Sequence, residues 1–311
     1  MVNKEKNFIS AVVYMYNAAD RVEPFLRMLL GVLEANFEHS EIICVNDCSG
    51  DDTAGCIRDA SALATHSSIS LLNMSHYHGL ELAMSAGLDL AIGDFVLEFD
   101  SACMDFDPAV VMQVYRKSLE GYDIVSASPD VPQKLSSRLF YAAFNHFAKL
   151  GGKMCTERFR ILSRRVINRT GSMNKTIPYR KVVYANCGLK TANLRYAPAQ
   201  KTCDGSRGER GYRRRLAVDA LILFTDVGYR FSMAMTLLMM LAAVFMAVYS
   251  VVIYCAGNPV EGWTTTVLFL SVAFLGLFGI LTVIIKYLQI LVDLVFKRKN
   301  YSFESIEKLT K

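Results

Sequence analysis

The chain has 311 residues, of which 52% are hydrophobic and 20% charged, and its formal net charge is +5. This length allows one large domain or two modest ones, and the apolar fraction is high for a purely soluble protein. The modest positive charge suits an anionic membrane surface or phosphorylated ligands and gives no reason to expect a nucleic-acid partner. The eight cysteines form no Cys-x-x-Cys pair and no zinc-type cluster, so most of them are expected to be buried reduced thiols in a cytoplasmic domain.

The first part of the chain alternates short apolar runs with helical patterns. Residues 79–91, for example, show the spacing of apolar residues that predicts a helix between two such apolar runs. This alternation predicts βαβ units and a mostly parallel sheet, which is an α/β fold. No Gly-x-Gly-x-x-Gly or Gly-x-x-x-x-Gly-Lys loop is present, which argues against a dinucleotide or P-loop site. The runs predicted to be buried strands are 9–13, 42–45, 69–73 and 96–99.

Polar side chains follow three of these predicted strands. Tyr16 and Asn17 follow the first strand, Asp47 follows the second, and Asp100 follows the fourth. The carboxyl ends of parallel strands share one edge of the sheet, where ligands bind, so these side chains are expected to converge on a single ligand. On spacing alone, Asp100 could equally be a residue that only caps the following turn.

Several segments resemble, in order along the chain, the motifs of family 2 glycosyltransferases. Residues 12–17 are similar to the VVPxYN opening of that family, and residues 45–53 to its VDDxSxDxT loop. The glycine and alanine spacing over 79–94 resembles its NxGxxxAxxxGxxxAxGD helix. Residues 158–164 resemble the DFRLLSR segment of its polyprenyl-phosphate branch, which includes enzymes of the bactoprenol glucosyltransferase and dolichol-phosphate mannosyltransferase-like types. Two C-terminal apolar segments complete the resemblance.

The resemblance implies the GT-A fold, an α/β domain that binds a nucleotide-diphospho-sugar donor. It implies that Asp47 accepts a hydrogen bond from the base and that Tyr16 and Asn17 line the base and ribose. A nucleotide-sugar is therefore the expected donor. The donor-binding residues that the resemblance implies are Tyr14, Tyr16, Asn17, Asp47, Gly79 and Asp100.

The resemblance also implies a divalent cation, Mg²⁺ or Mn²⁺, held on the diphosphate by Asp100. A hard cation with oxygen ligands stabilises the charge of a leaving nucleoside diphosphate, and the sequence does not choose between the two metals. The second aspartate of the family's Asp-x-Asp motif is Ala102 here. Asp105 is therefore the expected second ligand, with Asp107 as an alternative. Another alternative is that Asp100 and the diphosphate are the only ligands of the cation.

The catalytic-base position of the family is occupied by Arg158, and Glu157 precedes it. A phosphate acceptor is already ionised near neutral pH, so it needs positioning more than deprotonation. Arg158, Arg160 and Arg164 could position it, because arginine forks match phosphate oxygens. A solvated basic face is the alternative. If the acceptor is a sugar hydroxyl, Glu157 is the candidate base. The predicted catalytic residues are Asp100, Asp105, Glu157, Arg158 and Arg160.

Two long segments near the C-terminus carry no charged residue and are predicted to cross a membrane, whose hydrocarbon core is about 30 Å thick. Lysines and arginines flank the pair but are missing from the short connection, so both ends are expected to be cytoplasmic. The predicted organisation is a cytoplasmic glycosyltransferase domain at 1–215, a juxtamembrane segment at 216–230, transmembrane helices at 231–254 and 264–285, and a cytoplasmic amphipathic helix and tail at 286–311.

Three further segments are assigned from their patterns. Residues 136–150 form a helical stripe that either rests on the bilayer or packs on the sheet. Residues 181–198 alternate enough to predict a pair of strands. Residues 301–311 are expected to be a polar tail without assignable chemistry.

The sequence thus predicts a membrane-anchored inverting glycosyltransferase of the plasma or inner membrane. It would move a sugar from a nucleotide-sugar to a polyprenyl-phosphate acceptor on the cytoplasmic face, in cell-envelope glycan synthesis. One alternative is a glycosyltransferase that extends a lipid-linked oligosaccharide of a capsule or cell wall. Another is a catalytically silent homologue that scaffolds such a complex, which Ala18 and Ala102 in place of acidic residues would fit. The sugar, the nucleotide and the formation of a homo-oligomer are left open.

Overall fold

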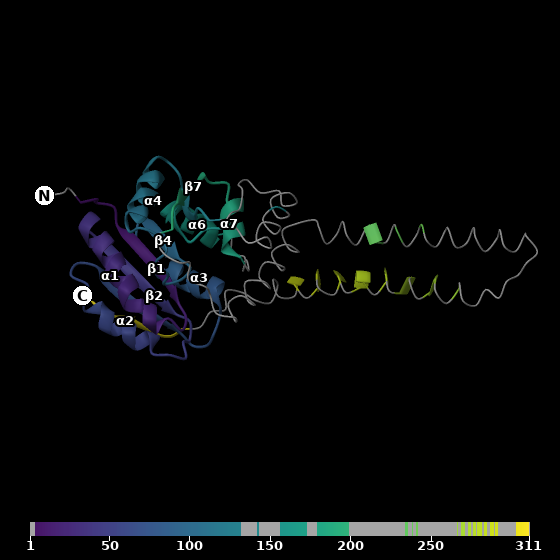
Figure 1. Cartoon of the computed structure of the whole chain (residues 1–311), viewed down its shortest axis with the longest axis horizontal. Helices are drawn as coiled ribbons and strands as arrows, with labels where there is room; N and C mark the ends of the chain where they lie inside the picture. Colours follow the sequence, from purple (N-terminus) through teal and green to yellow (C-terminus); the bar gives the residue numbers. More distant parts are fainter. Residues whose placement is uncertain are drawn as a thin grey trace, which may run out of the picture.

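A computed structural model describes residues 4–131, 156–172, 179–198 and 303–310, together with isolated positions between 142 and 291. Its strands form one sheet in the order β7-β5-β6-β4-β1-β2-β3-β8 (Figure 1). The strands are β1 (Ile9–Met15), β2 (Ser40–Asn46), β3 (Ser68–Met74), β4 (Phe95–Phe99), β5 (Ile124–Pro129), β6 (Phe159–Ser163), β7 (Thr191–Tyr196) and β8 (Phe303–Lys308). The helices are α1 (Ala19–Asn36), α2 (Thr53–Ser61), α3 (Leu80–Leu90), α4 (Ala109–Leu119), α6 (Arg164–Ser172) and α7 (Arg180–Asn186).

The predicted parallel arrangement is confirmed for the first four strands. β1 pairs in parallel with both β2 and β4, and β2 pairs in parallel with β3. β6 then lies antiparallel between β4 and β5. The carboxyl ends of β1 to β4 therefore share one edge of the sheet, which is where the predicted site residues are placed.

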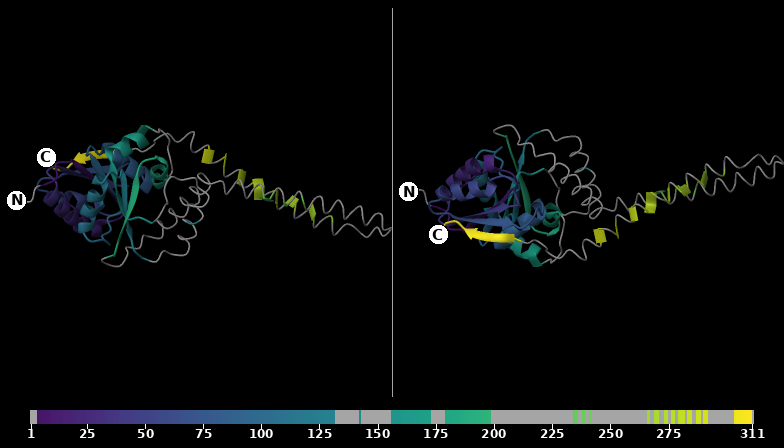
Figure 2. Two further views of the ribbon diagram at one scale, coloured as in Figure 1. Left: turned by 90° about the horizontal axis from the view of Figure 1, so that it is seen from above. Right: turned by 90° about the horizontal axis from the view of Figure 1, so that it is seen from below.

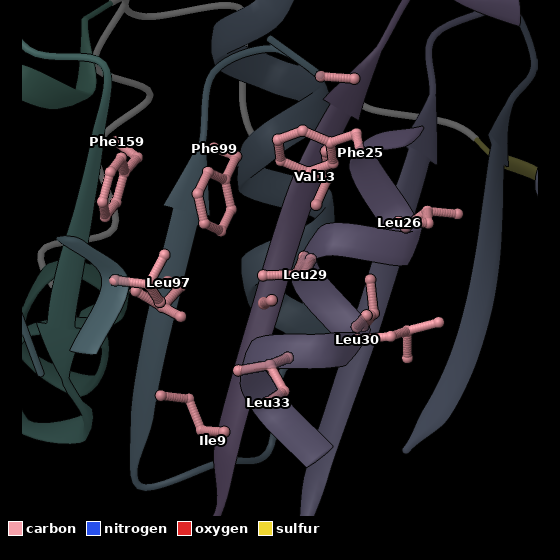
Figure 3. Close-up of a cluster of buried hydrophobic side chains, with 14 of the residues drawn as sticks. Ile9, Val13, Phe25, Leu26, Leu29, Leu30, Leu33, Leu97, Phe99 and Phe159 are labelled. Carbon is pink, nitrogen blue, oxygen red and sulfur yellow. The ribbon is translucent and has the colours of Figure 1, made fainter. Parts of the chain in front are cut away.

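The two faces of β1 pack against different helices, as the two-residue period of a strand requires. Ile9 and Val13 face the core formed with α1, whose buried leucines belong to one hydrophobic cluster with Leu97 and Phe99 of β4 (Figure 3). Val12 faces α3 on the other side. A Cβ atom at Gly87 of α3 would lie 2.5 Å from Val12 Cγ1, so this helix can approach the sheet so closely only with glycine at this position.

The predicted pair of strands over 181–198 is wrong in its first half. Residues 180–186 form α7, and only the second half is a strand, β7, which pairs in parallel with β5. Val182 and Tyr184 are both buried and are two residues apart, which produces a strand-like pattern in the sequence. The contacts of α7 with the rest of the domain override that local preference.

The predicted polar tail at 301–311 is also wrong, because it contains β8. This strand runs antiparallel to β3 at the edge of the sheet, and Figure 2 shows it (yellow) against the domain formed by the first part of the chain. Thr310 accepts a hydrogen bond from the Ile69 N–H at 2.7 Å, and Arg58 of α2 forms a two-pronged ion pair with Glu307. β8 pairs with the backbone groups that β3 would otherwise expose.

Other predicted segments lie outside the described residues. These are nearly all of the helical stripe at 136–150, most of the predicted span at 231–254, and nearly half of the predicted span at 264–285. Within the part of the chain that the structure describes, no helix is both long enough and apolar enough to cross a membrane.

Candidate functional site

The loops that follow β1 and β2 are joined at the carboxyl edge of the sheet. The Asn17 N–H donates to the Ser49 hydroxyl at 3.1 Å, and the Gly50 N–H donates to Asn17 Oδ1 at 2.8 Å. The Ala18 N–H donates to Thr53 Oγ1 at 2.9 Å. Asn17 has a φ of 46°, a left-handed conformation that asparagine tolerates better than most residues. The two predicted motifs therefore lie side by side, and Asn17 connects them.

Asp47 connects the end of β2 to the start of α3. Its fully buried carboxylate accepts hydrogen bonds from the Tyr14 hydroxyl at 2.9 Å and from the N–H groups of His78 and Gly79, both at 2.8 Å. Gly79 has a φ of 81° and a ψ of 163°, a conformation essentially restricted to glycine. Asp47 thus already has three donors, and its contact with the donor base stays a prediction.

An aromatic pair lies at the ends of β1 and β3. The rings of Tyr16 and Tyr77 are 4.9 Å apart, Tyr16 is half-buried, and Tyr77 is 44% exposed. Tyr16 was predicted as a donor-binding residue, whereas Tyr77 was not. Its only signal in the sequence is its position three residues after β3, where no motif marks it.

Asp100 lies at the carboxyl end of β4 and is held by two arginines. Its carboxylate accepts a hydrogen bond from Arg160 Nη2 at 3.0 Å and another from Arg180 Nη2 at 2.9 Å, and its side chain is 15% exposed. Burial alone would raise the pKa of Asp100, but the charges of Arg160, Arg180 and Lys181 hold it well below its usual range. Asp100 is therefore a permanent carboxylate in a site rich in guanidinium groups.

Glu98 lies two residues earlier on β4 and forms the buried centre of the same cluster. It accepts hydrogen bonds from Arg160 Nη1 at 2.7 Å, Arg180 Nη1 at 3.1 Å and the Tyr184 hydroxyl at 2.6 Å. Arg180 also donates through Nε to Glu81 of α3 at 2.9 Å. The sequence interpretation missed these residues apart from Arg160. The available signal was a glutamate inside an apolar strand, because a buried charge needs a partner.

The remaining predicted residues have partners of their own. Asp105 is fully buried, and its carboxylate is bound by the Arg158 guanidinium and by the Tyr196 hydroxyl, the latter at 3.0 Å. Glu157 lies 3.3 Å from Arg160 and 3.4 Å from Lys181. Arg158 and Asp105 thus contact each other, whereas Asp100, Glu157 and Arg160 belong to the cluster around Glu98.

The residues predicted as metal ligands do not fit a divalent cation. Both oxygens of Asp100 accept from guanidinium groups, and Asp105 has no exposed surface and is bound by Arg158. A cation beside Asp100 would meet two like charges, whereas oxygen-rich sites are what Mg²⁺ and Mn²⁺ prefer. Among the described residues, no group of three or more His, Cys, Asp or Glu side chains could hold a metal.

The fold belongs to a known class. It is similar to that of the mannosyltransferase PcManGT from Pyrobaculum calidifontis, solved with GDP-Man and Mn²⁺, with a TM-score of 0.50, 15% identity, and 89% of this chain and 88% of that chain covered. This similarity concerns the fold alone, which is of the GT-A type with a mostly parallel α/β sheet, as predicted.

The family is defined by the sequence. Residues 10–171 match glycosyl transferase family 2, and the chain belongs to this family. A glycosyltransferase of Synechocystis sp., sll0501, is 31% identical over 188 residues, which are 58% of this chain and 58% of that protein. The bactoprenol glucosyl transferase of Shigella phage SfV is 26% identical over 280 residues, which are 86% of this chain and 88% of that protein. The predicted family is thus confirmed.

Proposed function

We propose that this protein is a membrane-anchored inverting glycosyltransferase that transfers a sugar from a nucleotide-sugar to a polyprenyl phosphate on the cytoplasmic face. The observation that carries the proposal is the cluster of Asp100, Arg160 and Arg180 at the carboxyl end of β4, beside the joined loops of β1 and β2. Relatives named for bactoprenol and undecaprenyl-phosphate transfer support a lipid-phosphate acceptor.

The reaction is a single displacement. An oxygen of the acceptor phosphate forms a bond to the anomeric carbon while the bond from that carbon to the nucleoside diphosphate breaks, and the leaving diphosphate keeps the electron pair. The role of the site is to position two anions and to stabilise the charge that develops. Arg160 and Arg180 are the charged side chains that lie beside Asp100.

A phosphate acceptor suits this site better than a sugar hydroxyl. A phosphate oxygen attacks as an anion and needs no base, whereas a hydroxyl needs one. Glu157, the candidate base, is ion-paired with Arg160 and Lys181, and Asp105 is buried against Arg158. Both carboxylates are thus engaged by cationic side chains, which favours polyprenyl phosphate over a lipid-linked oligosaccharide as the acceptor.

Two observations support the membrane anchor. β7 and β8 flank the segment 199–302 and lie in one sheet, so a chain that leaves this domain to cross a bilayer must return by crossing it again. This agrees with two spans and a cytoplasmic C-terminus. In addition, large apolar side chains at described helical positions of the second predicted span and just after it are each at least 45% exposed. They are Leu270, Phe274, Leu277, Leu281, Ile284, Leu288 and Leu291.

The experiment is a transfer assay with the full-length chain in membranes. Radiolabelled UDP- and GDP-sugars are supplied with polyprenyl phosphate, and the organic extract is analysed for a lipid-linked sugar. We expect a labelled lipid with one donor and a large loss of labelling in Asp100→Ala, because this carboxylate holds both guanidinium groups. If a labelled product forms only when a lipid-linked oligosaccharide is supplied, that glycan and not polyprenyl phosphate is the acceptor. The absence of transfer from every donor would overturn the proposal.

A further inference from the structure

We propose that the diphosphate of the donor is bound by the paired guanidinium groups of Arg160 and Arg180 and that its binding needs no divalent cation. This inference rests on the proposed function, since it concerns how the same site binds a nucleoside diphosphate. It also departs from the expectation drawn from the family resemblance, in which Asp100 holds a metal.

Two guanidinium groups are built into this site, where the carboxylates of Glu81, Glu98, Asp100 and Glu157 surround them. Arg160 and Arg180 approach the Asp100 carboxylate from two different elements, β6 and α7, and each places one Nη2 within 3.0 Å of it. Arg160 is 1% exposed and Arg180 5% exposed, so their charges are poorly screened by solvent. A cation that bound Asp100 would have to displace them or lie against them.

The two guanidinium groups also have hydrogen-bond donors to spare. A guanidinium carries five N–H groups. Arg160 donates once from Nη1 to Glu98 and once from Nη2 to Asp100, its Nη2 also lies 3.3 Å from Glu157, and its buried Nε has no partner. Arg180 uses Nε, Nη1 and Nη2 once each in its side-chain hydrogen bonds. A buried donor without a partner is costly and marks a place where an acceptor is missing.

An anion supplies the missing acceptors, whereas a cation does not. Diphosphate oxygens accept several hydrogen bonds each and match the planar fork of arginine. Asp100 is the more exposed member of the trio at 15%, so a ligand reaches the guanidinium groups past its carboxylate. Asp100 then acts as a positioning residue, which holds the two groups side by side until the diphosphate oxygens take over the Nη2 donors.

The test measures nucleotide binding by calorimetry to the full-length chain in lipid nanodiscs. UDP and GDP are titrated separately, once with EDTA and once with Mn²⁺. We expect one nucleotide to bind with a Kd that agrees within about threefold in the two conditions, because the countercharge belongs to the protein. Arg180→Gln should weaken this binding about tenfold or more in both conditions. Arg27→Gln, which removes a guanidinium from an exposed ion pair with Glu23 on α1, is the matched control and should bind as the unaltered chain does.

Asp100→Asn separates the two roles of this carboxylate. A metal ligand would be lost, and nucleotide affinity with Mn²⁺ would fall. A positioning residue that competes with the diphosphate becomes a weaker competitor, so affinity should be unchanged or higher. Binding seen only with Mn²⁺ and lost in Asp100→Asn overturns the inference and leaves the proposed function intact. If neither nucleotide binds under either condition, the proposed function fails, and the inference fails with it. The metal comparison uses the unaltered chain, so it stands even if Arg180→Gln does not fold.

Discussion

Asp47 and Asp100 occupy equivalent places in the sheet, since each follows a parallel strand, yet their surroundings differ in charge. Asp47 is bound by a hydroxyl and two backbone N–H groups, all of them neutral. Asp100 is bound by two arginines. A position at the carboxyl end of a strand therefore locates a residue at the ligand edge of the sheet, but the partners of its side chain determine its role.

The difference follows from what each set of donors can do. The Asp47 carboxylate binds the backbone N–H groups of His78 and Gly79, and it therefore holds the start of α3 in place. Arginine side chains can exchange one acceptor for another at low geometric cost, because each guanidinium offers five donors. Asp47 is thus suited to hold structure, and Asp100 to share its partners with a ligand.

The largest loss of stability is expected when the structural aspartate, Asp47, is replaced. Asp47→Ala removes the carboxylate that the Tyr14 hydroxyl and the N–H groups of His78 and Gly79 share. Each lost hydrogen bond to this fully buried carboxylate costs about 1–3 kcal/mol, so the free energy of unfolding should fall by about 3 kcal/mol or more. Denaturant unfolding followed by tyrosine fluorescence measures this loss.

Asp100→Ala is the matched variant. Arg160 and Arg180 keep Glu98 as a shared acceptor, so the loss of stability should be closer to about 1 kcal/mol while sugar transfer is lost. Equal destabilisation by the two alanines would contradict the assignment of different roles to the two aspartates.

An effect smaller than that of Asp47→Ala is expected from Tyr14→Phe, which removes one of the three donors to Asp47 and leaves the ring in place. The hydrogen bond is buried and its acceptor is a carboxylate, so its loss should cost about 1–2 kcal/mol. The melting temperature of this variant should lie between those of the unaltered chain and of Asp47→Ala. A melting temperature equal to that of the unaltered chain would show that the two backbone donors suffice for Asp47.

The sequence predicted best where the signals are local. β1 to β4 follow from short apolar runs, and the loop residues after them follow from motifs that need no distant partner. α7 was missed because two buried residues two positions apart mimic a strand, and β8 because the edge that it completes, β3, lies more than 200 residues away. No local pattern contains that information.

The site was predicted in part for the same reason. Asp47 and Asp100 were placed at the correct edge of the sheet from strand ends alone. The role of Asp100 was tied to a second acid at Asp105, but Asp105 is buried against Arg158 and Tyr196. The pairing of Asp100 with Arg180 depends on a helix 80 residues away, and only the fold brings the two together.

A variant of Glu34 extends the comparison to pH. Glu34 of α1, like Asp47, is bound by neutral donors: the Thr65 hydroxyl and the backbone N–H groups of residues 65–67. Burial raises the pKa of Glu34, but these hydrogen bonds lower it from 4.5 to about 2. Because the folded-state pKa lies below the unfolded value, the stabilisation is present above pH 4.5 and is lost as the pH falls towards 2.

Glu34→Gln tests this. At pH 7 the variant should be less stable by about 1 kcal/mol, since solvent screens a partly exposed carboxylate. The difference should shrink as the pH is lowered from 4.5 towards 2. Urea unfolding at a series of pH values measures it, and a difference that is independent of pH would assign the loss to packing instead of charge.

The smallest effect is expected where an arginine–carboxylate pair lies at the surface. Arg58 and Glu307 have the same two-pronged geometry that makes arginine effective in the Asp100 cluster, but their side chains are 47% and 33% exposed. Solvent and salt screen such a pair, and β8 is also held by its ladder with β3 and by Thr310. Arg58→Gln should therefore leave the melting temperature within experimental error, whereas Arg160→Gln, the same change inside the buried cluster, should lower it clearly. Equal melting temperatures for the two variants would show that burial does not make the Arg160 ion pairs more stabilising than the surface pair of Arg58.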